Sequence, residues 1–282
     1  MSMDPAGRVV RSTVRPHSET RRHAPIRTFL HTDDGVTIDS VYDPPSFVYD
    51  ASRPPARDVV FVIAHGFTGD VDRPHVRRVV QALTRYGGVV TFSFRGHGAS
   101  GGRSTVGDRE VLDLATAVAW ARGLGHARVA TVGFSMGGSV ALRHAALYGP
   151  QTDAHTDAVV SVSAPARWYY RGTAPMRRLH WLVTRPAGRL VGRYGFRTRI
   201  HHREWNPVPL SPVEAVPRIA PTPLLIVHGD RDGYFPLDHP RMLAEAAGDH
   251  AELWIEPIGH AEHAVGDELL DRIGDWAVTA GG

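Results

Sequence analysis

Short apolar runs rich in Val and Ile recur along the chain and alternate with segments of helical spacing. Six of these runs predict buried strands, at 59–64, 89–94, 129–132, 158–162, 223–227 and 251–255. Three intervening segments have apolar residues every three or four positions and predict helices, at 73–86, 108–124 and 137–148. Ahead of them, residues 28–42 predict a β-hairpin that turns at Asp34 and Gly35. This alternation indicates an α/β fold with a mainly parallel central sheet and helices on both faces.

Composition narrows the chemistry that the chain can perform. It has 282 residues, of which 42% are hydrophobic, and no cysteine. This length suits one large α/β domain. The lack of cysteine excludes a thiol nucleophile, a Cys-ligated zinc and an iron–sulfur cluster. All 32 basic residues are arginine, so Schiff-base and phosphate-loop chemistry that needs lysine is excluded as well.

The formal net charge of +3 is unevenly distributed along the chain. Residues 1–27 hold six Arg and two acidic residues, and residues 166–205 hold ten Arg with Glu204 as their one acid. The remainder has 16 Arg against 26 acidic residues. We expect residues 1–25 to be a disordered basic tail and 26–282 to form one domain. Since the tail lacks a signal-peptide apolar stretch, and no apolar run reaches the ~18 residues of a membrane span, we expect a cytoplasmic protein.

One serine stands between a predicted strand and a predicted helix. Residues 133–137 read Gly-Phe-Ser-Met-Gly, a G-x-S-x-G pattern centred on Ser135. At a strand–turn–helix this pattern is typical of a nucleophile, because the sharp turn lifts the hydroxyl above the sheet. Residues 98–102 also fit, but Ser100 lies in a glycine-rich loop with no helix directly after it. Ser135 is therefore the candidate nucleophile.

A serine hydroxyl needs a base to remove its proton, and the base needs an orienting acid. The candidate acids Asp230 and Asp232 follow the strand at 223–227. The candidate bases His260 and His263 follow the next strand, at 251–255. Serine, acid and histidine thus come in the order expected on such a sheet. Spacing alone does not choose between the two acids or between the two histidines.

Acyl transfer also needs N–H donors for the negative oxygen of its tetrahedral intermediate. One candidate is the backbone N–H of Met136, the residue after the serine. The other is the backbone N–H of Phe67, in the loop 65–69 that follows the first apolar strand. The small Gly66 beside it lets the backbone come close to a substrate.

From about residue 28 onward, the sequence resembles the α/β-hydrolase superfamily. Three segments resemble bacterial cinnamoyl-esterase-like and monoacylglycerol-lipase-like enzymes: His-Gly-Phe-Thr-Gly at 65–69, Phe-Arg-Gly-His-Gly-Ala-Ser at 94–100 and Gly-Phe-Ser-Met-Gly-Gly at 133–138. The resemblance implies that the acid ends a G-x-x-D, which selects Asp232. It also implies that the base follows a glycine, which selects His260.

Residues 166–216 interrupt the predicted sheet, and the resemblance implies that they form a helical, Arg-rich cap over the site. Arg167, Trp168, Tyr169 and Trp181 are its candidate substrate contacts. The cap arginines have four possible partners, namely an anionic substrate, an anionic membrane, nucleic acid or the acidic body of the domain itself. We expect pairing with the body, because opposite charge is available there. Nucleic acid is disfavoured because the chain has no recognised binding module.

Together these features predict a serine hydrolase that cleaves carboxylic esters of small molecules through an acyl-enzyme. The alternatives are a thioesterase, a lysophospholipase or a monoacylglycerol-lipase-like enzyme acting on an anionic or lipid substrate. A further alternative is a non-hydrolytic member of the fold that binds a ligand or a protein. We expect no cofactor and no metal, since the adjacent His201 and His202 point apart and no carboxylate has ligand spacing to them.

Overall fold

The structure is a computed structural model that describes residues 24–46 and 59–280. The predicted basic tail at 1–25 lies outside these residues, apart from its last two. Among the described residues, no helix is both long enough and apolar enough to cross a membrane.

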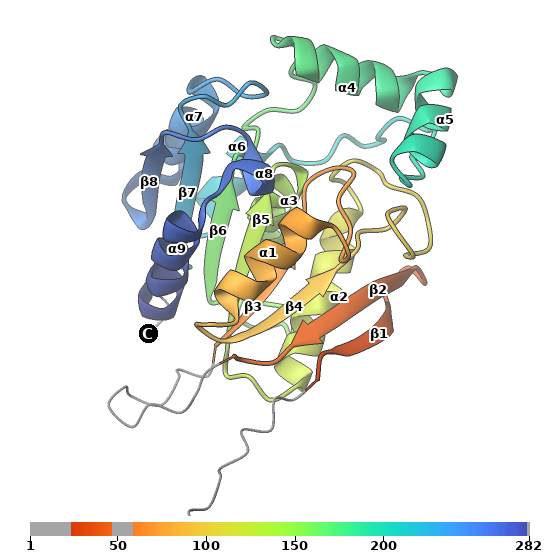
Figure 1. Ribbon diagram of the computed structural model, residues 1–282. Coiled ribbons are helices and arrows are strands. Elements are labelled where there is room, and N and C mark those ends of the chain that lie inside the picture. The colour runs from red at the N-terminus through yellow and green to blue at the C-terminus, as the bar shows by residue number, and fades with distance from the viewer. Residues whose placement is uncertain (1–23, 47–58, 281–282) are drawn as a thin grey trace, which may run out of the picture.

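A single mixed sheet forms the centre of the domain (Figure 1). Its strands, in chain order, are β1 (Ile26–His31), β2 (Thr37–Asp43), β3 (Val59–Ala64), β4 (Gly88–Phe92), β5 (Arg128–Phe134), β6 (Ala158–Val162), β7 (Leu224–Gly229) and β8 (Ala251–Glu256). Their order across the sheet is β1-β2-β4-β3-β5-β6-β7-β8. β2 pairs antiparallel with β1 and β4, and the remaining neighbours pair in parallel. The predicted hairpin is confirmed, and Gly35 takes the left-handed turn conformation that glycine favours, with φ of 78°.

Helices cover both faces of this sheet, as the alternation predicts. They are α1 (Pro74–Leu83), α2 (Glu110–Gly123), α3 (Met136–Leu147), α4 (Ala174–Thr184), α5 (Pro186–Gly195), α6 (Pro212–Ala215), α7 (Asp238–Ala247), α8 (Ala261–Ala264) and α9 (Asp267–Ala280), with 3₁₀ turns η1 (Val216–Arg218) and η2 (Gly248–His250). Helices α2, α3 and α7 pack on one face, and α1 and α9 pack on the other. Alternate residues of β3 face the two clusters, Val60 and Val62 toward α2 and α3, Phe61 and Ile63 toward α1 and α9.

The chain between β6 and β7, here named the β6–β7 connection (residues 163–223), extends beyond the sheet. Its helices α4 and α5 lie above the end of the sheet at which the parallel strands terminate (Figure 1). Backbone contacts tie its return path to the loop after β4: Thr198 bridges His97, and Ile200 bridges Ser104. The connection is therefore held to the domain by main-chain hydrogen bonds next to the strand ends.

Candidate active site

Ser135 sits at the turn between β5 and α3 in a strained conformation, with φ of 51° and ψ of −113°. A side chain at Gly133 would meet the carbonyl of Gly137, and one at Gly137 would meet the carbonyl of Ala64. Both glycines are thus required by close backbone approach. The Ser135 N–H donates to Val162 O at 2.8 Å, which anchors the turn to β6. The side chain is presented at the carboxyl ends of the parallel strands.

His260 and Asp232 lie beside this serine in a continuous chain of hydrogen bonds. His260 Nε2 is 2.9 Å from Ser135 Oγ, and His260 Nδ1 is 2.7 Å from Asp232 Oδ2. The structure brings together the residues that the sequence proposes, and it separates the alternatives. Asp230 is exposed and pairs with the neighbouring Arg231, whereas His263 packs against the ring of His75 in a tilted arrangement.

The surroundings of Asp232 keep its carboxylate ionised. Its side chain has no exposed surface. Burial alone raises its pKa, but the hydrogen bond from His260 and those from the backbone of Phe235 and Tyr234 outweigh burial and lower the pKa. These two N–H groups lie 3.0 and 2.8 Å from Oδ1, which leaves Oδ2 for His260. The ring of Tyr234 stacks on the imidazole of His260 at 4.2 Å and limits its rotation.

The loop 65–69 that carries Phe67 is held from both sides. His65 is fully buried, and burial lowers its pKa to about 3, so the ring is neutral. Its Nε2 accepts the N–H of Phe94 at 3.0 Å, which leaves Nδ1–H to donate to Gly66 O at 2.7 Å. On the other side, the Gly66 N–H donates to Oε1 of Glu262 at 2.9 Å. Glu262 is a site residue that the sequence analysis did not identify.

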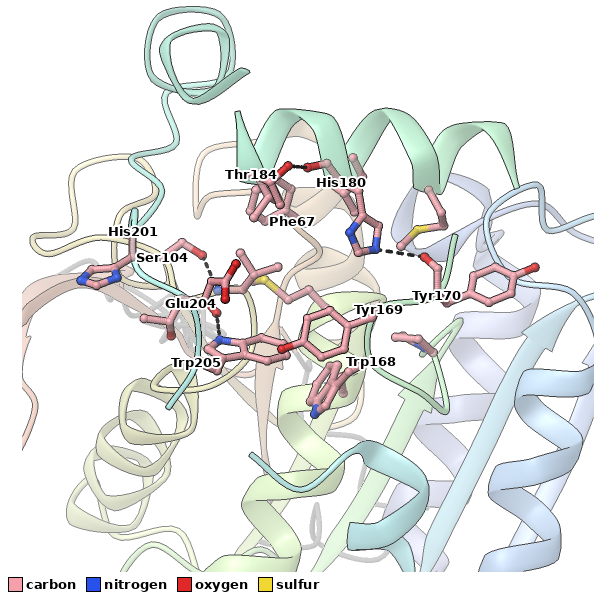
Figure 2. A pocket seen from close by; sticks show the side chains of 18 of the residues that line it. Phe67, Ser104, Trp168, Tyr169, Tyr170, His180, Thr184, His201, Glu204 and Trp205 are labelled. Carbon is pink, nitrogen blue, oxygen red and sulfur yellow. Dashed lines mark hydrogen bonds between the residues drawn. The ribbon is translucent and has the colours of Figure 1, made fainter. Parts of the chain in front are cut away.

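A cavity of about 390 Å³ opens over Ser135, between the domain body and the β6–β7 connection. Phe67, Met136 and Phe235 contribute to it from the body, and Trp168, Tyr169 and His180 from the connection. Figure 2 shows Trp168, Tyr169 and Trp205 grouped together, with His180 and Thr184 reaching down from α4. The Trp205 ring lies 5.1 Å from the Trp168 ring and 5.5 Å from the Tyr169 ring. This volume is in the range of small-molecule sites.

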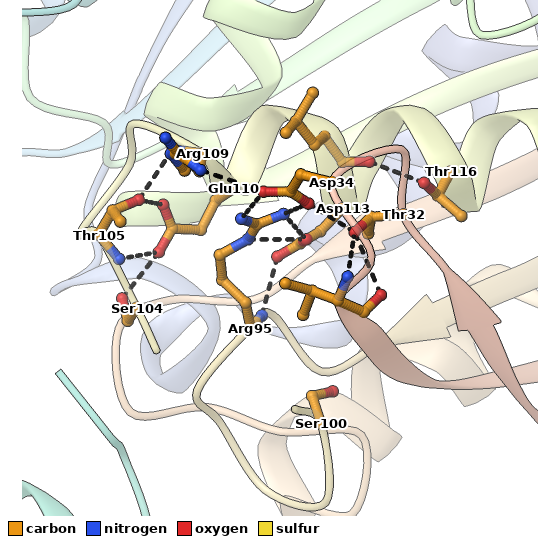
Figure 3. A network of polar contacts seen from close by, with 12 residues as sticks. Thr32, Asp34, Arg95, Ser100, Ser104, Thr105, Arg109, Glu110, Asp113 and Thr116 are labelled. Carbon is orange, nitrogen blue, oxygen red and sulfur yellow. Dashed lines mark hydrogen bonds and ion pairs between the residues drawn. The ribbon is translucent and has the colours of Figure 1, made fainter. Parts of the chain in front are cut away.

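One wall of the cavity is the loop 104–107, which a buried carboxylate organises. Glu110 has no exposed surface and accepts five hydrogen bonds from this loop, at 2.6–3.1 Å. Next to it, Arg95 pairs with Asp34 and with Asp113, each at 2.7 Å (Figure 3). The network joins the β1–β2 turn to α2. The ion pairs of Arg95 give the start of the 94–100 segment a structural role near the site.

Two comparisons place this architecture among known proteins. A model of the alpha/beta hydrolase family matches residues 59–272. The chain belongs to the alpha/beta hydrolase family. The fold and the resemblance predicted from its sequence are thereby confirmed.

Solved structures of other alpha/beta hydrolases share the fold over most of their length. An esterase of Pyrococcus furiosus has 22% identity and a TM-score of 0.67, over 92% of this chain and 93% of its own. A serine hydrolase without a lid from Xanthomonas campestris has 20% identity and a TM-score of 0.57, over 90% of this chain and 91% of its own. An enzyme of Butyrivibrio proteoclasticus, solved with ferulic acid bound, has 18% identity and a TM-score of 0.55, over 89% of this chain and 96% of its own.

The arginines of the β6–β7 connection of this alpha/beta hydrolase do not pair with the body as expected. Of the ten arginines in 166–205, Arg167 alone forms an ion pair within the described residues, with Asp238 at 2.9 Å. Others bond to carbonyls: Arg189 to those of Val183 and Thr184, and Arg199 to that of Ser100. The expectation of charge pairing is therefore wrong for the described residues, because nine of these ten arginines form no ion pair with them.

Three of the four proposed substrate contacts line the cavity of this alpha/beta hydrolase: Arg167, Trp168 and Tyr169. Trp181 is not among the lining residues. Its side chain is 49% exposed on α4, next to Arg177 and Arg178. Nothing in its position links it to Ser135.

A group of His75, Glu262 and His263 has ligand atoms within 4.8 Å of one another, the spacing that a metal ion needs. Its carboxylate already accepts the Gly66 N–H. The group comes from α1 and α8, and sequence spacing gave no sign of it. The expectation that His201 and His202 point apart is wrong, because their rings stack with centroids 5.1 Å apart. The group of three does not include them.

Proposed function

We propose that this alpha/beta hydrolase cleaves carboxylic esters through an acyl-enzyme on Ser135. The observation that carries the proposal is the chain of hydrogen bonds from Ser135 Oγ through His260 to Asp232, at 2.9 and 2.7 Å. It stands at the floor of a cavity large enough for a small ester. Esterases among the solved structures of the same fold are consistent with it.

In the acylation step, Ser135 Oγ attacks the ester carbonyl as His260 Nε2 takes its proton. Asp232 accepts the Nδ1–H of His260, which holds the reactive tautomer and stabilises the imidazolium. The backbone N–H groups of Phe67 and Met136 donate to the oxyanion. Met136 suits this role because it is the first residue of α3, where helical N–H groups have no intrahelical acceptor.

Departure of the alcohol and hydrolysis of the acyl-enzyme use the same groups in reverse. The protonated His260 gives its proton to the leaving alkoxide, and the C–O bond of the ester breaks. The neutral imidazole then takes a proton from water, which attacks the acyl carbon. Release of the carboxylic acid returns the proton to Ser135 Oγ. No cofactor enters any step.

We further propose that the β6–β7 connection acts as a cap that shapes the substrate pocket. Trp168, Tyr169 and Trp205 form its apolar surface over Ser135. A thioester would fit the same mechanism, since sulfur replaces only the leaving oxygen. Comparison of matched oxygen esters and thioesters of one acyl group distinguishes the two.

Labelling with a fluorophosphonate probe tests the proposal against a non-hydrolytic role. We expect covalent labelling of the wild-type chain and none of Ser135→Ala. Ser161→Ala is the matched control, because Ser161 is buried on β6 and its hydroxyl has no partner within the described residues. Labelling that survives Ser135→Ala contradicts the proposal, as does an unlabelled wild-type chain.

Turnover of p-nitrophenyl butyrate tests the acid of the triad. Asp232→Asn is expected to lower kcat by roughly 10³- to 10⁴-fold, because the amide no longer holds the His260 tautomer. Asp230→Asn changes a neighbouring exposed aspartate and should leave kcat within about twofold. Equal losses in the two variants would argue against Asp232.

A further inference from the structure

The walls of the cavity differ in charge according to the part of the chain that supplies them. The lining residues that the described part of the domain body supplies, among them Phe67, Val106, Ser135 and Met136, include no charged side chain. The residues from the β6–β7 connection include four arginines: Arg167, Arg171, Arg189 and Arg203. The reacting carbonyl would therefore lie in an uncharged half, opposite a cationic roof.

Carboxylates of the described residues neutralise only part of the positive charge of this roof. Arg167 pairs with Asp238, but Arg171, Arg189 and Arg203 form no ion pair within the described residues. Arg203 makes no side-chain hydrogen bond to any of those residues either. Among the described residues that line the cavity, Glu204 is the one with an acidic side chain. Three guanidinium groups thus face one carboxylate.

Positive groups near His202, which also lines the cavity, support an excess of positive charge in the roof. Desolvation, the neighbouring His201 and the positive charges of Arg203, Arg103 and Arg189 lower the pKa of His202. Arginines from the loop after β4 and from the connection therefore act on the same imidazole, which lines the cavity with Arg189 and Arg203. Such a cluster is stabilised when an anion binds between its members.

We infer that the cavity selects esters that carry an anionic group, a carboxylate or a phosphate, on the side remote from the reacting carbonyl. Arg203 is the main contact of that anion, and Arg171 and Arg189 add positive charge to the same cavity lining. Guanidinium groups suit both anions because their planar N–H pairs match two oxygens at once. The apolar lining near Ser135 would hold the aliphatic part. This inference rests on the proposed function.

A matched pair of substrates tests the inference. p-Nitrophenyl pentanoate and the mono-p-nitrophenyl ester of glutaric acid have equal acyl length and differ in a terminal carboxylate. We expect wild-type kcat/KM to favour the glutarate ester, and the preference to shrink in high salt. Arg203→Gln should reduce the ratio of the two kcat/KM values by roughly tenfold, the effect of one charge-assisted hydrogen bond.

Arg178→Gln serves as the control for net charge. Arg178 is exposed on α4 outside the cavity, so its loss removes the same charge without touching the roof. The ratio should stay unchanged. A wild-type ratio at or below one, or equal ratios in Arg203→Gln and the wild type, would overturn the inference.

Calorimetry with monomethyl glutarate separates failure of the anion site from failure of the hydrolase. Ser135→Ala should bind this ester without turnover, and Ser135→Ala/Arg203→Gln should bind it at least tenfold more weakly. If the wild type hydrolyses neither test ester, the proposed function fails. The titration then still shows whether the cavity binds the anion. No measurable binding to Ser135→Ala, or equal binding to both variants, overturns the inference.

A lipid headgroup is a second source of the same anion. Sedimentation with phosphatidylglycerol vesicles distinguishes it from a soluble ester. Vesicle binding that Arg203→Gln weakens and Arg178→Gln leaves unchanged places the headgroup in the cavity and supports the inference. The opposite result would be vesicle binding that Arg178→Gln weakens, together with no binding of monomethyl glutarate. That result locates the anion contact on the outer surface of the connection and contradicts the inference.

Discussion

Glu262 links two segments that are far apart in the sequence and adjacent at the site. Its Oε1 receives the N–H of Gly66, 196 residues earlier, and its side chain is almost completely buried. Gly66 precedes Phe67, whose N–H we assign to the oxyanion. Glu262 is therefore a positioning residue for that donor.

Two substitutions of Glu262 distinguish its role as a hydrogen-bond acceptor from the space that its side chain fills. Glu262→Ala removes the acceptor, so the loop can move and kcat should fall roughly ten- to a hundredfold with KM nearly unchanged, since the donor acts mainly in the transition state. Glu262→Gln retains an amide oxygen that can accept the Gly66 N–H. Steady-state kinetics on p-nitrophenyl butyrate should therefore place it within a few-fold of the wild type. A kcat for Glu262→Gln as low as that for Glu262→Ala would refute the assignment.

Local sequence predicted some of these residues and missed others for a physical reason. The sequence indicates Ser135 as a candidate nucleophile because close backbone approach requires Gly133 and Gly137 beside it. The whole pattern therefore lies within five residues. The choice of Asp232 over Asp230 needed the resemblance or the structure, because both follow the same strand. Glu262 could not be found from spacing, since its role depends on a long-range contact that no local pattern encodes.

At the scale of elements, the loop 104–107 depends on the first residue of α2. Glu110 accepts from the Ser104 and Thr105 hydroxyls and from three backbone N–H groups. In this loop Val106 has φ of 58°, a conformation that a β-branched residue rarely adopts. The carboxylate therefore stabilises a strained wall of the cavity.

Replacement of Glu110 should loosen this wall. The amide nitrogen of Glu110→Gln cannot accept hydrogen bonds, so the free energy of unfolding should fall by about 1–3 kcal/mol. KM for p-nitrophenyl butyrate should rise several-fold, with a smaller change in kcat, because the wall contacts substrate and not the reacting atoms. Glu245→Gln, on the exposed face of α7, is the control for both urea denaturation and kinetics. An unchanged KM together with a lower stability would show that the loop does not shape the pocket.

The elements of the domain core were largely predictable, and those of the β6–β7 connection were not. Buried parallel strands produce continuous apolar runs, and the helices α2 and α3 that cover them bury most of their residues, so both kinds of element are rich in apolar positions. In the connection, Trp181, Leu190 and Tyr194 are exposed, so apolar positions there do not mark a side that faces the core. The sequence thus indicated a helical insertion but not the bounds of α4 and α5.

At the scale of the whole molecule, several histidines are buried in neutral form. His144 has a pKa of about 3, and His97 and His239 have pKa values of about 4, because burial disfavours the imidazolium. In the unfolded chain they titrate near 6.5. Below that pH the unfolded state binds protons that the folded state does not.

The free energy of unfolding should therefore fall as the pH drops from about 6.5 toward 4. Each of these histidines contributes about 1.4 kcal/mol per pH unit in that window. Urea denaturation between pH 7.5 and 4.5 measures the slope. His144→Gln removes one titrating group. The slope of unfolding free energy against pH should therefore become shallower by the contribution of one histidine, about 1.4 kcal/mol per pH unit. A slope that this variant leaves unchanged would show that His144 is protonated in the folded state.

The way in which the β6–β7 connection is attached has a consequence for the evolution of this molecule. Its ties to the body include the backbone bridges at Thr198 and Ile200, which do not depend on side-chain identity. Arg171 and Arg203 form no ion pair with the described part of the body, so they add none to those ties. Mutations at these two positions can therefore change the charge of the roof at small cost to folding. Substrate preference can therefore change during evolution, or under selection in the laboratory, while the residues of the domain body around Ser135 stay the same.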